Sequence, residues 1–251
     1  MSDQTFAERH ILITGGGTGI GRATALAFAD QGAARVTIVG RRNEPLAEVA
    51  AIHPAVVPLT ADATTSEGIE AIDASVTEHG GLDVLVHNAG IYRTTPLDEL
   101  NVDAVRDQLE INLIAPLLLT ARLLPVLTAP GASIVLVSSI SARFASPTTS
   151  VYAATKAATD SFIRSWAMEL GPKGIRVNGV APGLIDTDIH AAGGLDQKLI
   201  TAWHETYAAA VPTERVGRVE DVTPWITRLA EPASAWVTGE IIAMDGGGLL
   251  L

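Results

Sequence analysis

The sequence contains no cysteine. Disulfide bonds, thiolate metal sites and a cysteine nucleophile are therefore all excluded. Basic residues are also scarce, with 17 Lys and Arg against 28 Asp and Glu and a formal net charge of −11. Because binding to a nucleic-acid backbone needs a basic surface, this balance argues against a nucleic-acid partner. Any anionic ligand therefore has to be bound by a few cationic side chains that lie close together.

Membrane signals are absent as well. The N-terminal segment lacks the basic-then-apolar order of a signal peptide, and we expect no apolar stretch to reach the ~20 residues that span a bilayer. A soluble cytoplasmic protein without a membrane partner is the expectation. The 251 residues are 47% hydrophobic, which is ample for a sizeable core, so we expect one domain over residues 1–251.

Short apolar runs alternate with helical patterns along the chain, without repeats, linkers or low-complexity segments. These runs are continuous, which is typical of a parallel sheet covered on both faces. We therefore expect a doubly wound α/β fold with about seven strands. The predicted strands are residues 10–14, 35–40, 55–61, 82–87, 132–137, 174–180 and 240–244.

A glycine-rich turn follows the first predicted strand and precedes a helical pattern. Glycines let the backbone approach a pyrophosphate closely, and the helix N-terminus offers free N–H groups and the positive end of its dipole. A glycine cluster alone could be a flexible loop, but its place between a buried strand and a helix favours a dinucleotide site. The turn residues expected to bind the cofactor are Gly15, Thr18, Gly19, Ile20 and Gly21.

Two arginines, Arg41 and Arg42, end the second predicted strand. An NAD-binding unit places Asp or Glu at this point, where it accepts hydrogen bonds from the ribose hydroxyls. Two guanidinium groups instead suit the 2′-phosphate of NADP(H), although a solvated basic turn is the alternative. Asp62 and Ala63 end the third strand. The Asp62 carboxylate either accepts from an adenine amine or caps the helix that begins near Ser66.

Small and polar residues also end three later strands. Asn88, Ala89 and Gly90 follow the fourth strand and permit close approach to a flat cofactor. Ser139 follows the fifth strand, and residues 181–183 follow the sixth. Ligands of open α/β sheets gather at this edge.

Tyr152 and Lys156 lie four residues apart in a helix-forming run, so they share one face of the helix. A lysine beside a tyrosine favours the ionised phenol and makes it a better proton donor and acceptor near neutral pH. The same spacing is common in amphipathic surface pairs. Only together with the glycine turn and the strand-end residues does the pair indicate a redox site for a carbonyl.

Residues 184–211 interrupt the alternation of strands and helices, and we expect a mobile substrate lid there. Trp203 and Tyr207 either line a substrate pocket or only anchor the lid. Arg93 and Phe144 follow strand-end motifs and are further pocket candidates, with an exposed arginine as the simpler alternative.

Two more segments carry expectations. A helical stretch is expected over residues 98–127, where Pro116 and Pro125 should bend or end it. Three leucines, residues 249–251, close the chain. Because three leucines in water form an exposed apolar patch, we expect them to be buried against another subunit or against their own chain.

In this order the motifs resemble those of the classical short-chain dehydrogenase/reductase family, and the resemblance covers nearly the whole chain. Residues 14–21 are similar to the family's Thr-Gly-x3-Gly-x-Gly turn, residues 88–90 to its Asn-Ala-Gly segment and residues 152–156 to its Tyr-x3-Lys signature. Asn112 matches the active-site asparagine and Ser139 the catalytic serine. The segment that resembles the nicotinamide-binding segment contributes Pro182, Gly183, Ile185 and Thr187.

The resemblance implies a single-domain Rossmann fold, a homotetramer and an NADP(H)-dependent ketoreductase, similar to 3-oxoacyl-acyl-carrier-protein reductases. It implies that Tyr152 gives a proton to the carbonyl oxygen while Ser139 polarises the carbonyl. Lys156 would lower the phenol pKa and hold the ribose hydroxyls, and Asn112 would position a water that links Lys156 to solvent.

The chain departs from the family pattern at His87, Ala142 and Thr155, where many members carry Asn, Gly and Ser. These departures bear on the subfamily and not on the reaction class. Two alternative functions stay open at this point. One is an alcohol or sugar dehydrogenase that works oxidatively, and the other is an NADP-sensing protein without turnover.

Overall fold

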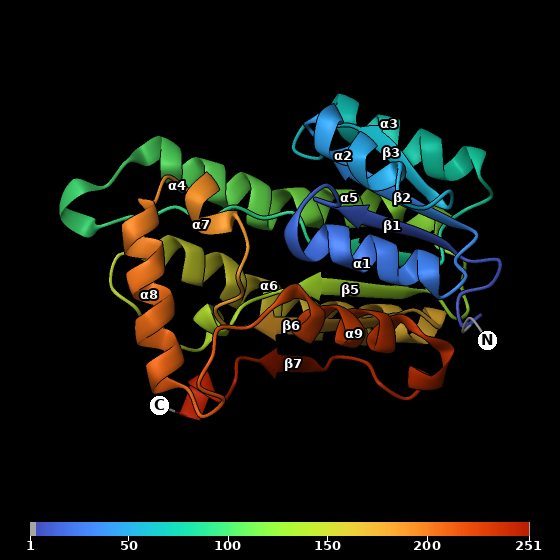
Figure 1. Cartoon of the computed structure of the whole chain (residues 1–251). Helices are drawn as coiled ribbons and strands as arrows, with labels where there is room; N and C mark the ends of the chain where they lie inside the picture. The colour runs from blue at the N-terminus through green and yellow to red at the C-terminus, as the bar shows by residue number, and fades with distance from the viewer. Residues whose placement is uncertain (1–3, 251) are drawn as a thin grey trace.

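A seven-stranded parallel sheet with helices on both faces forms the protein (Figure 1). The computed structural model describes residues 4–250. The strand order is β3-β2-β1-β4-β5-β6-β7, and every neighbouring pair is parallel. The predicted doubly wound α/β fold is therefore confirmed. The strands are β1 His10–Thr14, β2 Arg35–Gly40, β3 Val56–Thr60, β4 Val84–His87, β5 Ser133–Val137, β6 Arg176–Pro182 and β7 Ile241–Met244.

Nine α-helices are present in residues 4–250. Most of them follow a strand and return the chain to the other end of the sheet, as parallel pairing requires. They are α1 Gly19–Asp30, α2 Asn43–Ala50, α3 Ser66–Glu78, α4 Val102–Leu109, α5 Ala115–Leu123, α6 Ser150–Leu170, α7 Ile189–Ala192, α8 Gln197–Ala210 and α9 Val219–Ala230.

The core consists of two buried clusters, one on each face of the sheet. Ile72 of α3, Leu119 of α5 and Ile163 of α6 belong to one cluster. Phe28 of α1 and Ile226 of α9 belong to the other. All five side chains are completely or almost completely removed from solvent. Each contributes on the order of 1.5–3 kcal/mol by burial, which holds the strand ends of the sheet in fixed positions.

The strand order reverses direction between β1 and β4. From β1 the chain first builds outward through β2 and β3, then returns to build β4 to β7 on the other side. Loops at the C-terminal ends of β1 and β4 consequently diverge and leave a crevice. This reversal positions the site described below.

The predicted helix over residues 98–127 is a segmented rod. A separate 3-10 turn at Leu97–Glu99 precedes it. Within the rod, α4 and α5 are joined by a π turn at Glu110–Ile114, and a 3-10 turn at Leu124–Val126 ends it. Pro116 does not break the rod, because it lies in the first turn of α5, where a missing N–H is tolerated. The expectation that Pro116 ends the helix is wrong, and a bend at Pro116 stays a prediction.

The rod from Val102 to Val126 spans 25 residues and has a window with a mean hydropathy of 1.6, of which 28% is buried. By length and composition alone it is long and apolar enough to cross a membrane. The expectation that no apolar stretch reaches that length is therefore wrong. A cytoplasmic location stays a prediction from the sequence.

The lid over residues 184–211 is mostly helical. It contains α7 and α8, which stand beyond the C-terminal ends of the strands (Figure 1). Asp196 caps α8 by accepting a hydrogen bond from the backbone N–H of Lys198 at 2.8 Å. The Asp cap followed by an alanine-rich run is the local signal for this helix.

The C-terminal leucines are only partly covered by their own chain. Leu249 is half-buried, whereas Leu250 is 84% exposed. Leu251 lies outside the described residues. Burial of Leu250 against its own chain is thus wrong, and a contact with another subunit stays a prediction.

A buried histidine at the end of β4 should make stability fall in acid. His87 lies in the core beside the Thr120 hydroxyl at 2.7 Å, and burial lowers its pKa from 6.5 to about 3. Between these two pH values the unfolded chain binds a proton that the folded chain does not, so the free energy of unfolding decreases as pH falls from 6.5 towards 3. The loss is at most about 1.4 kcal/mol per pH unit.

We expect His87→Gln to flatten this decline, because glutamine can keep the hydrogen bond to Thr120 and has no proton to gain. Urea unfolding at pH 7, 5.5 and 4.5 measures the slope. His79→Gln, at an exposed histidine directly after α3, is the matched control. Equal slopes for the wild type and His87→Gln would contradict the assignment.

Candidate active site

The glycine turn after β1 is tied to the end of β4 by Thr14 and Asn88. The Thr14 hydroxyl accepts hydrogen bonds from the backbone N–H groups of Asn88 and Ala89, both at 3.1 Å. The Asn88 amide donates to the carbonyls of Thr14 and Gly15, both at 3.0 Å. These bonds tie the two loops together at the base of the crevice.

Two glycines of the turn are required by its backbone, and a third by packing. Gly15 and Gly19 have φ angles of +68° and +53°, a region that favours glycine. A Cβ atom on Gly21 would lie 2.2 Å from the Gly15 carbonyl oxygen and 2.4 Å from the Asn88 amide nitrogen. Gly21 does not line the cavity. It allows α1 to start directly under the turn.

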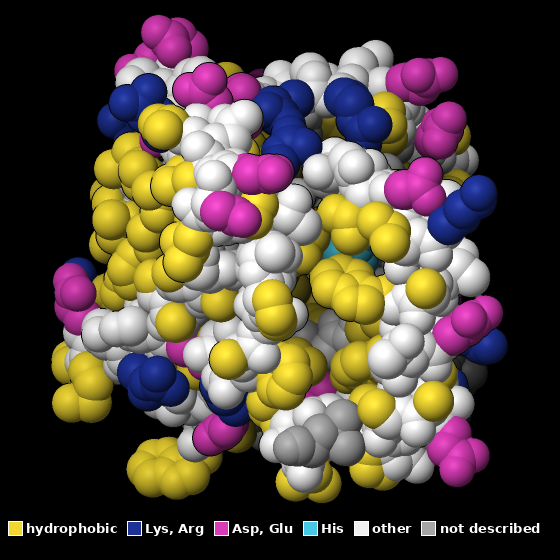
Figure 2. Space-filling model, turned by 90° about the vertical axis from the view of Figure 1, so that its left-hand side faces the viewer, with side chains coloured by type: hydrophobic (Ala, Val, Ile, Leu, Met, Phe, Trp, Pro, Cys, Tyr) yellow, Lys and Arg dark blue, Asp and Glu magenta, His cyan; other side chains and the backbone are white. Residues whose placement is uncertain are grey.

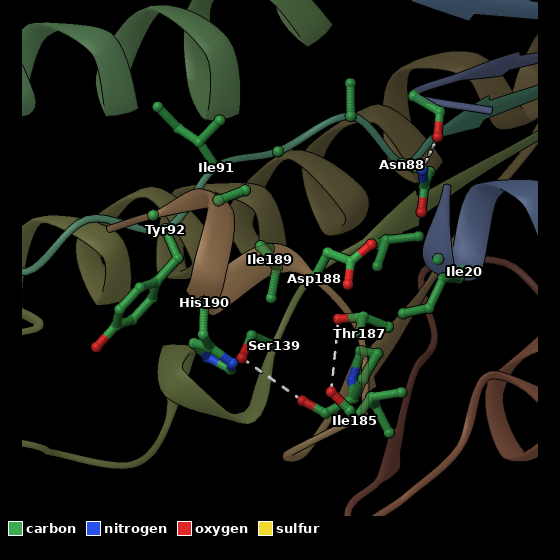
Figure 3. A pocket seen from close by; sticks show the side chains of 18 of the residues that line it. Ile20, Asn88, Ile91, Tyr92, Ser139, Ile185, Thr187, Asp188, Ile189 and His190 are labelled. Atoms are coloured by element: carbon green, nitrogen blue, oxygen red, sulfur yellow. Dashed lines mark hydrogen bonds between the residues drawn. The ribbon is translucent and has the colours of Figure 1, made fainter. Parts of the chain in front are cut away.

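A single cavity of about 880 Å³ runs along the C-terminal ends of the strands. Figure 3 shows Ile20 and Asn88 at one end of the view and Tyr92 and His190 at the other. Most of the predicted site residues line this cavity. They are Gly15, Thr18, Gly19, Ile20, Arg41, Arg42, Asp62, Ala63, Asn88, Ala89, Gly90, Ser139, Tyr152, Lys156, Pro182, Gly183, Ile185 and Thr187.

The two arginines after β2 are exposed at the rim of the cavity. In the part of the chain that the structure describes, neither Arg41 nor Arg42 has a hydrogen-bond or ion-pair partner. The Asp62 carboxylate accepts from the backbone N–H and the hydroxyl of Thr64 at 3.0 and 2.8 Å. It therefore shapes its own turn, while Thr65 caps α3. The alternative in which Asp62 caps the helix is wrong.

Ser139, Tyr152 and Lys156 meet on the wall of the cavity, and all three are buried. Ser139 caps a 3-10 turn after β5 and accepts a hydrogen bond from the Ser141 N–H at 3.1 Å. Tyr152 lies in the first turn of α6, and Lys156 lies one turn later. The Lys156 ammonium donates to the carbonyl of Val137 at 2.9 Å and lies 5.6 Å from the centre of the Tyr152 ring.

Burial shifts the pKa of both groups of the Tyr152–Lys156 pair. It raises the pKa of Tyr152 to about 12, partly opposed by the side-chain hydrogen bond with Ser139. It lowers the pKa of Lys156 to about 8, partly opposed by the charge of Asp160. The phenol pKa was expected to fall beside the lysine, whereas in the protein without a ligand the removal of the phenol from water raises it.

Asp160 connects the residues around the catalytic wall. Its carboxylate accepts from the Ser138 hydroxyl at 2.6 Å and from the Arg143 guanidinium at 3.2 Å. Ser138 directly precedes Ser139, and Asp160 lies one turn beyond Lys156. Through these two bonds the carboxylate holds the loop after β5 against α6. It is almost completely buried, and its negative charge compensates the buried ammonium of Lys156.

Asn112 lies on the π turn and does not line the cavity. Its side chain accepts from the backbone N–H of Ile91 at 2.8 Å, and donates to the Ile91 carbonyl at 2.9 Å and the Thr155 hydroxyl at 3.3 Å. The amide thus joins the segment after β4 to α6. A water-positioning role for Asn112 stays a prediction.

Several cavity residues were not predicted from the sequence, and Tyr92 and His190 are the most prominent of them. Tyr92 follows the Asn-Ala-Gly segment by two residues. Its closeness to this strand-end motif could have marked it as a residue of the site. His190 lies on α7, whose helical character was missed. Arg93, Phe144, Trp203 and Tyr207, named as pocket candidates, all line the cavity.

Comparison with known proteins agrees with this architecture. A family model described as "Enoyl-(Acyl carrier protein) reductase" matches residues 15–248. A cis-4-hydroxycyclohexanecarboxylate dehydrogenase of Sinomonas cyclohexanicum is 39% identical over 252 residues, which covers 97% of this chain and 98% of that protein. The 3-oxoacyl-[acyl-carrier-protein] reductase FabG of Thermotoga maritima is 34% identical over 241 residues, with 94% and 96% covered.

Among solved structures, a short-chain dehydrogenase/reductase of Caenorhabditis elegans with cofactor has a TM-score of 0.91 and 35% identity, and the match covers 98% of this chain and 97% of that one. Fold and cradle together define a dinucleotide-dependent oxidoreductase. The chain belongs to the short-chain dehydrogenase/reductase family, whose members use nicotinamide cofactors.

Asp160→Asn should destabilise the fold by about 1–3 kcal/mol, because the Arg143 bond loses its charge partner and the buried amide is a weaker acceptor. Urea unfolding measures the change. Asp73→Asn is the matched control, since the Arg122–Asp73 ion pair has 52% and 19% exposed side chains and should cost under about 1 kcal/mol. Equal losses in the two variants would contradict the role given to Asp160.

Proposed function

We propose that the protein is an NADP(H)-dependent reductase that converts a ketone to a secondary alcohol. The observation that carries this proposal is the meeting of Ser139, Tyr152 and Lys156 on one wall of a cavity that also holds the glycine cradle. The relatives include an enzyme named for a ring alcohol and one named for a 3-oxoacyl thioester. Their names therefore support the carbonyl–alcohol chemistry and leave the shape of the substrate open.

The bound nicotinamide would supply the hydride. Tyr152 would give its proton to the carbonyl oxygen, for which a pKa of about 12 keeps the phenol protonated at neutral pH. Ser139 would donate a hydrogen bond to the same oxygen and stabilise the charge that develops on it. Lys156 keeps two donor protons beyond its bond to Val137, and these suit the ribose hydroxyls.

The preference for NADP(H) rests on Arg41 and Arg42. Both are exposed beside the cavity and unpaired among residues 4–250, so neither pays for a lost ion pair when it binds an anion. A 2′-phosphate provides such an anion, and bidentate guanidinium contacts fit its oxygens. Because the chain has a net charge of −11, a local pair of cations is needed to bind the 2′-phosphate.

For the assembly, we propose a homotetramer of single-domain subunits. Ile114, Leu117 and Leu118 along the rod are 37–48% exposed, and Leu250 is 84% exposed. Figure 2 shows hydrophobic side chains gathered over part of the end that carries α7 and α8. Exposed apolar surface of this kind is typical of contacts between subunits. Sedimentation of the full chain and of a chain ending at Gly248 tests the contribution of the last three leucines.

Tyr152→Phe should lower kcat roughly 100- to 10,000-fold, because the variant keeps the ring and loses the proton donor. The measurement follows NADPH absorbance with a panel of ketones and 3-oxoacyl thioesters. NADPH binding, followed by its fluorescence, is the control for an intact cradle. Wild-type turnover in Tyr152→Phe would contradict the mechanism, and cofactor binding without any turnover in the wild type would favour a sensor.

Arg41→Ala and Arg42→Ala should each raise the KM for NADPH, by roughly 10- to 150-fold for the loss of a charge-assisted contact. The KM for NADH should change little, because NADH has no 2′-phosphate. Arg164→Ala, at an exposed arginine of α6 outside the cavity, is the matched control. A wild-type preference for NADH would overturn the role of both arginines.

A further inference from the structure

Four aromatic side chains form a continuous wall at the end of the cavity remote from Arg41 and Arg42. The ring of Tyr92 lies 5.2 Å from that of Tyr152 and 4.9 Å from that of His190, and the His190 ring lies 5.4 Å from that of Trp203. All these pairs meet edge to face. The wall therefore begins at the proposed proton donor and continues to the lid.

The wall joins three segments that are distant in the sequence. Tyr92 comes from the segment after β4, His190 from α7 and Trp203 from α8. In Figure 3, Tyr92, His190 and Ser139 lie on the same side of the cavity. Figure 2 shows a hollow framed by hydrophobic side chains, in which a histidine is partly visible. A molecule bound at Ser139 and Tyr152 would have this wall beside it.

The lid is closed directly onto this wall. A Cβ atom on Gly193, which follows α7, would lie 2.3 Å from the Tyr92 carbonyl oxygen, so the two backbones are in contact. Arg93 reaches the Ala192 carbonyl at 3.5 Å. Tyr92 is 4% exposed, whereas Trp203 is 37% exposed at the rim. The backbone after α7 therefore packs against the segment that carries Tyr92, and Trp203 lies at the exposed edge of the wall.

The closed wall contains polar atoms without partners. Among the described residues, four buried side-chain polar atoms lack a hydrogen bond, and three of them belong to this region, namely Tyr92 Oη, His190 Nδ1 and His204 Nε2. Buried polar groups are normally satisfied, and each exception calls for an explanation. Phenylalanine and leucine would fill the same space without this cost. A hydrogen-bonding group of a bound molecule would satisfy these atoms.

The imidazole of His190 suits that purpose in its neutral form. Burial, with a smaller contribution from the nearby His204, lowers the pKa of His190 to about 4. At neutral pH its Nδ1 can thus donate or accept, depending on the tautomer, and the Tyr92 hydroxyl can do either. A neutral hydroxyl, carbonyl or amide group is a suitable partner for both.

We propose that Tyr92, His190 and Trp203 form a substrate subsite that selects cyclic ketones with a hydrogen-bonding substituent across the ring from the carbonyl. This subsite rests on the proposed function, because the carbonyl end is placed by Ser139 and Tyr152. Flat or puckered rings match the aromatic faces of the wall. The lid admits the ring when it is open and encloses its polar substituent when it closes.

The test compares three ketones with NADPH: 4-hydroxycyclohexanone, 4-methylcyclohexanone and the open-chain 2-heptanone. The first two have similar size and differ in the hydrogen-bonding group. For the wild type, we expect kcat/KM to be at least about tenfold higher for the hydroxy than for the methyl compound, because a site with buried polar groups discriminates against a partner that leaves them unpaired. Both ring ketones should exceed 2-heptanone.

Variants of the wall residues separate the preference for the hydroxyl group from the preference for a ring. Tyr92→Phe and His190→Leu should each lower the ratio of the hydroxy to the methyl compound, and Trp203→Leu should lower the ratio of ring to open-chain ketone. Trp236→Leu, at a fully exposed tryptophan outside the cavity, should leave both ratios at their wild-type values. A wild-type ratio near one for either comparison, or ratios unchanged by the wall variants, would overturn the subsite.

A failure of the subsite can be told apart from a failure of the proposed reaction. If all three ketones are reduced at similar rates and Tyr152→Phe is inactive, the reductase stands and the subsite does not. If no ketone is reduced, calorimetric titration of the NADP⁺-saturated protein with the two ring ketones decides the subsite by itself. Tighter binding of the hydroxy compound that is lost in Tyr92→Phe supports it, and equal binding overturns it.

Discussion

The hydrogen bond from the Lys156 ammonium to the Val137 carbonyl is the contact on which the active site depends. It ties α6 to the last residue of β5, and so places the residues that follow β5 opposite the first turn of α6. This alignment of α6 with β5 lets the side chains of Ser139 and Tyr152 face each other. Burying an ammonium is costly, and Asp160 compensates part of that cost with a buried carboxylate one helical turn away.

A second constraint acts independently at the point where the strand order reverses. There Thr14 and Asn88 join the loops after β1 and β4 through four hydrogen bonds, and Gly21 allows α1 to pack under them. One constraint therefore builds a dinucleotide cradle and the other builds a wall for proton transfer. Because β4 and β5 are neighbours, the dinucleotide cradle and the wall for proton transfer open into the same cavity.

The parts of the site that could be predicted from sequence are those whose chemistry is local. Apolar runs indicated the strands, and the glycine turn with the Tyr152–Lys156 spacing indicated a cavity-lining set that the structure brings together. The predictions that failed depended on the burial of a side chain or on contacts between segments. The phenol pKa was expected to fall, but burial raises it, and spacing along a helix carries no information about burial. The rod continues through Pro116 because a π turn precedes it, which no local pattern showed.

The lid shows the same division between local pattern and tertiary contact. Its helix α7 has no side-chain cap, whereas the longer helix, α8, follows an Asp cap and was available to sequence reasoning in principle. The wall of Tyr92, His190 and Trp203 was not, because its members come from three segments that meet only in the fold. Its unpartnered polar atoms are the converse of the satisfied network around Asp160. One region is complete in the protein alone and keeps Ser139, Tyr152 and Lys156 in place. The other leaves polar atoms without partners in the protein alone, and the hydrogen-bonding groups of a bound molecule would satisfy them.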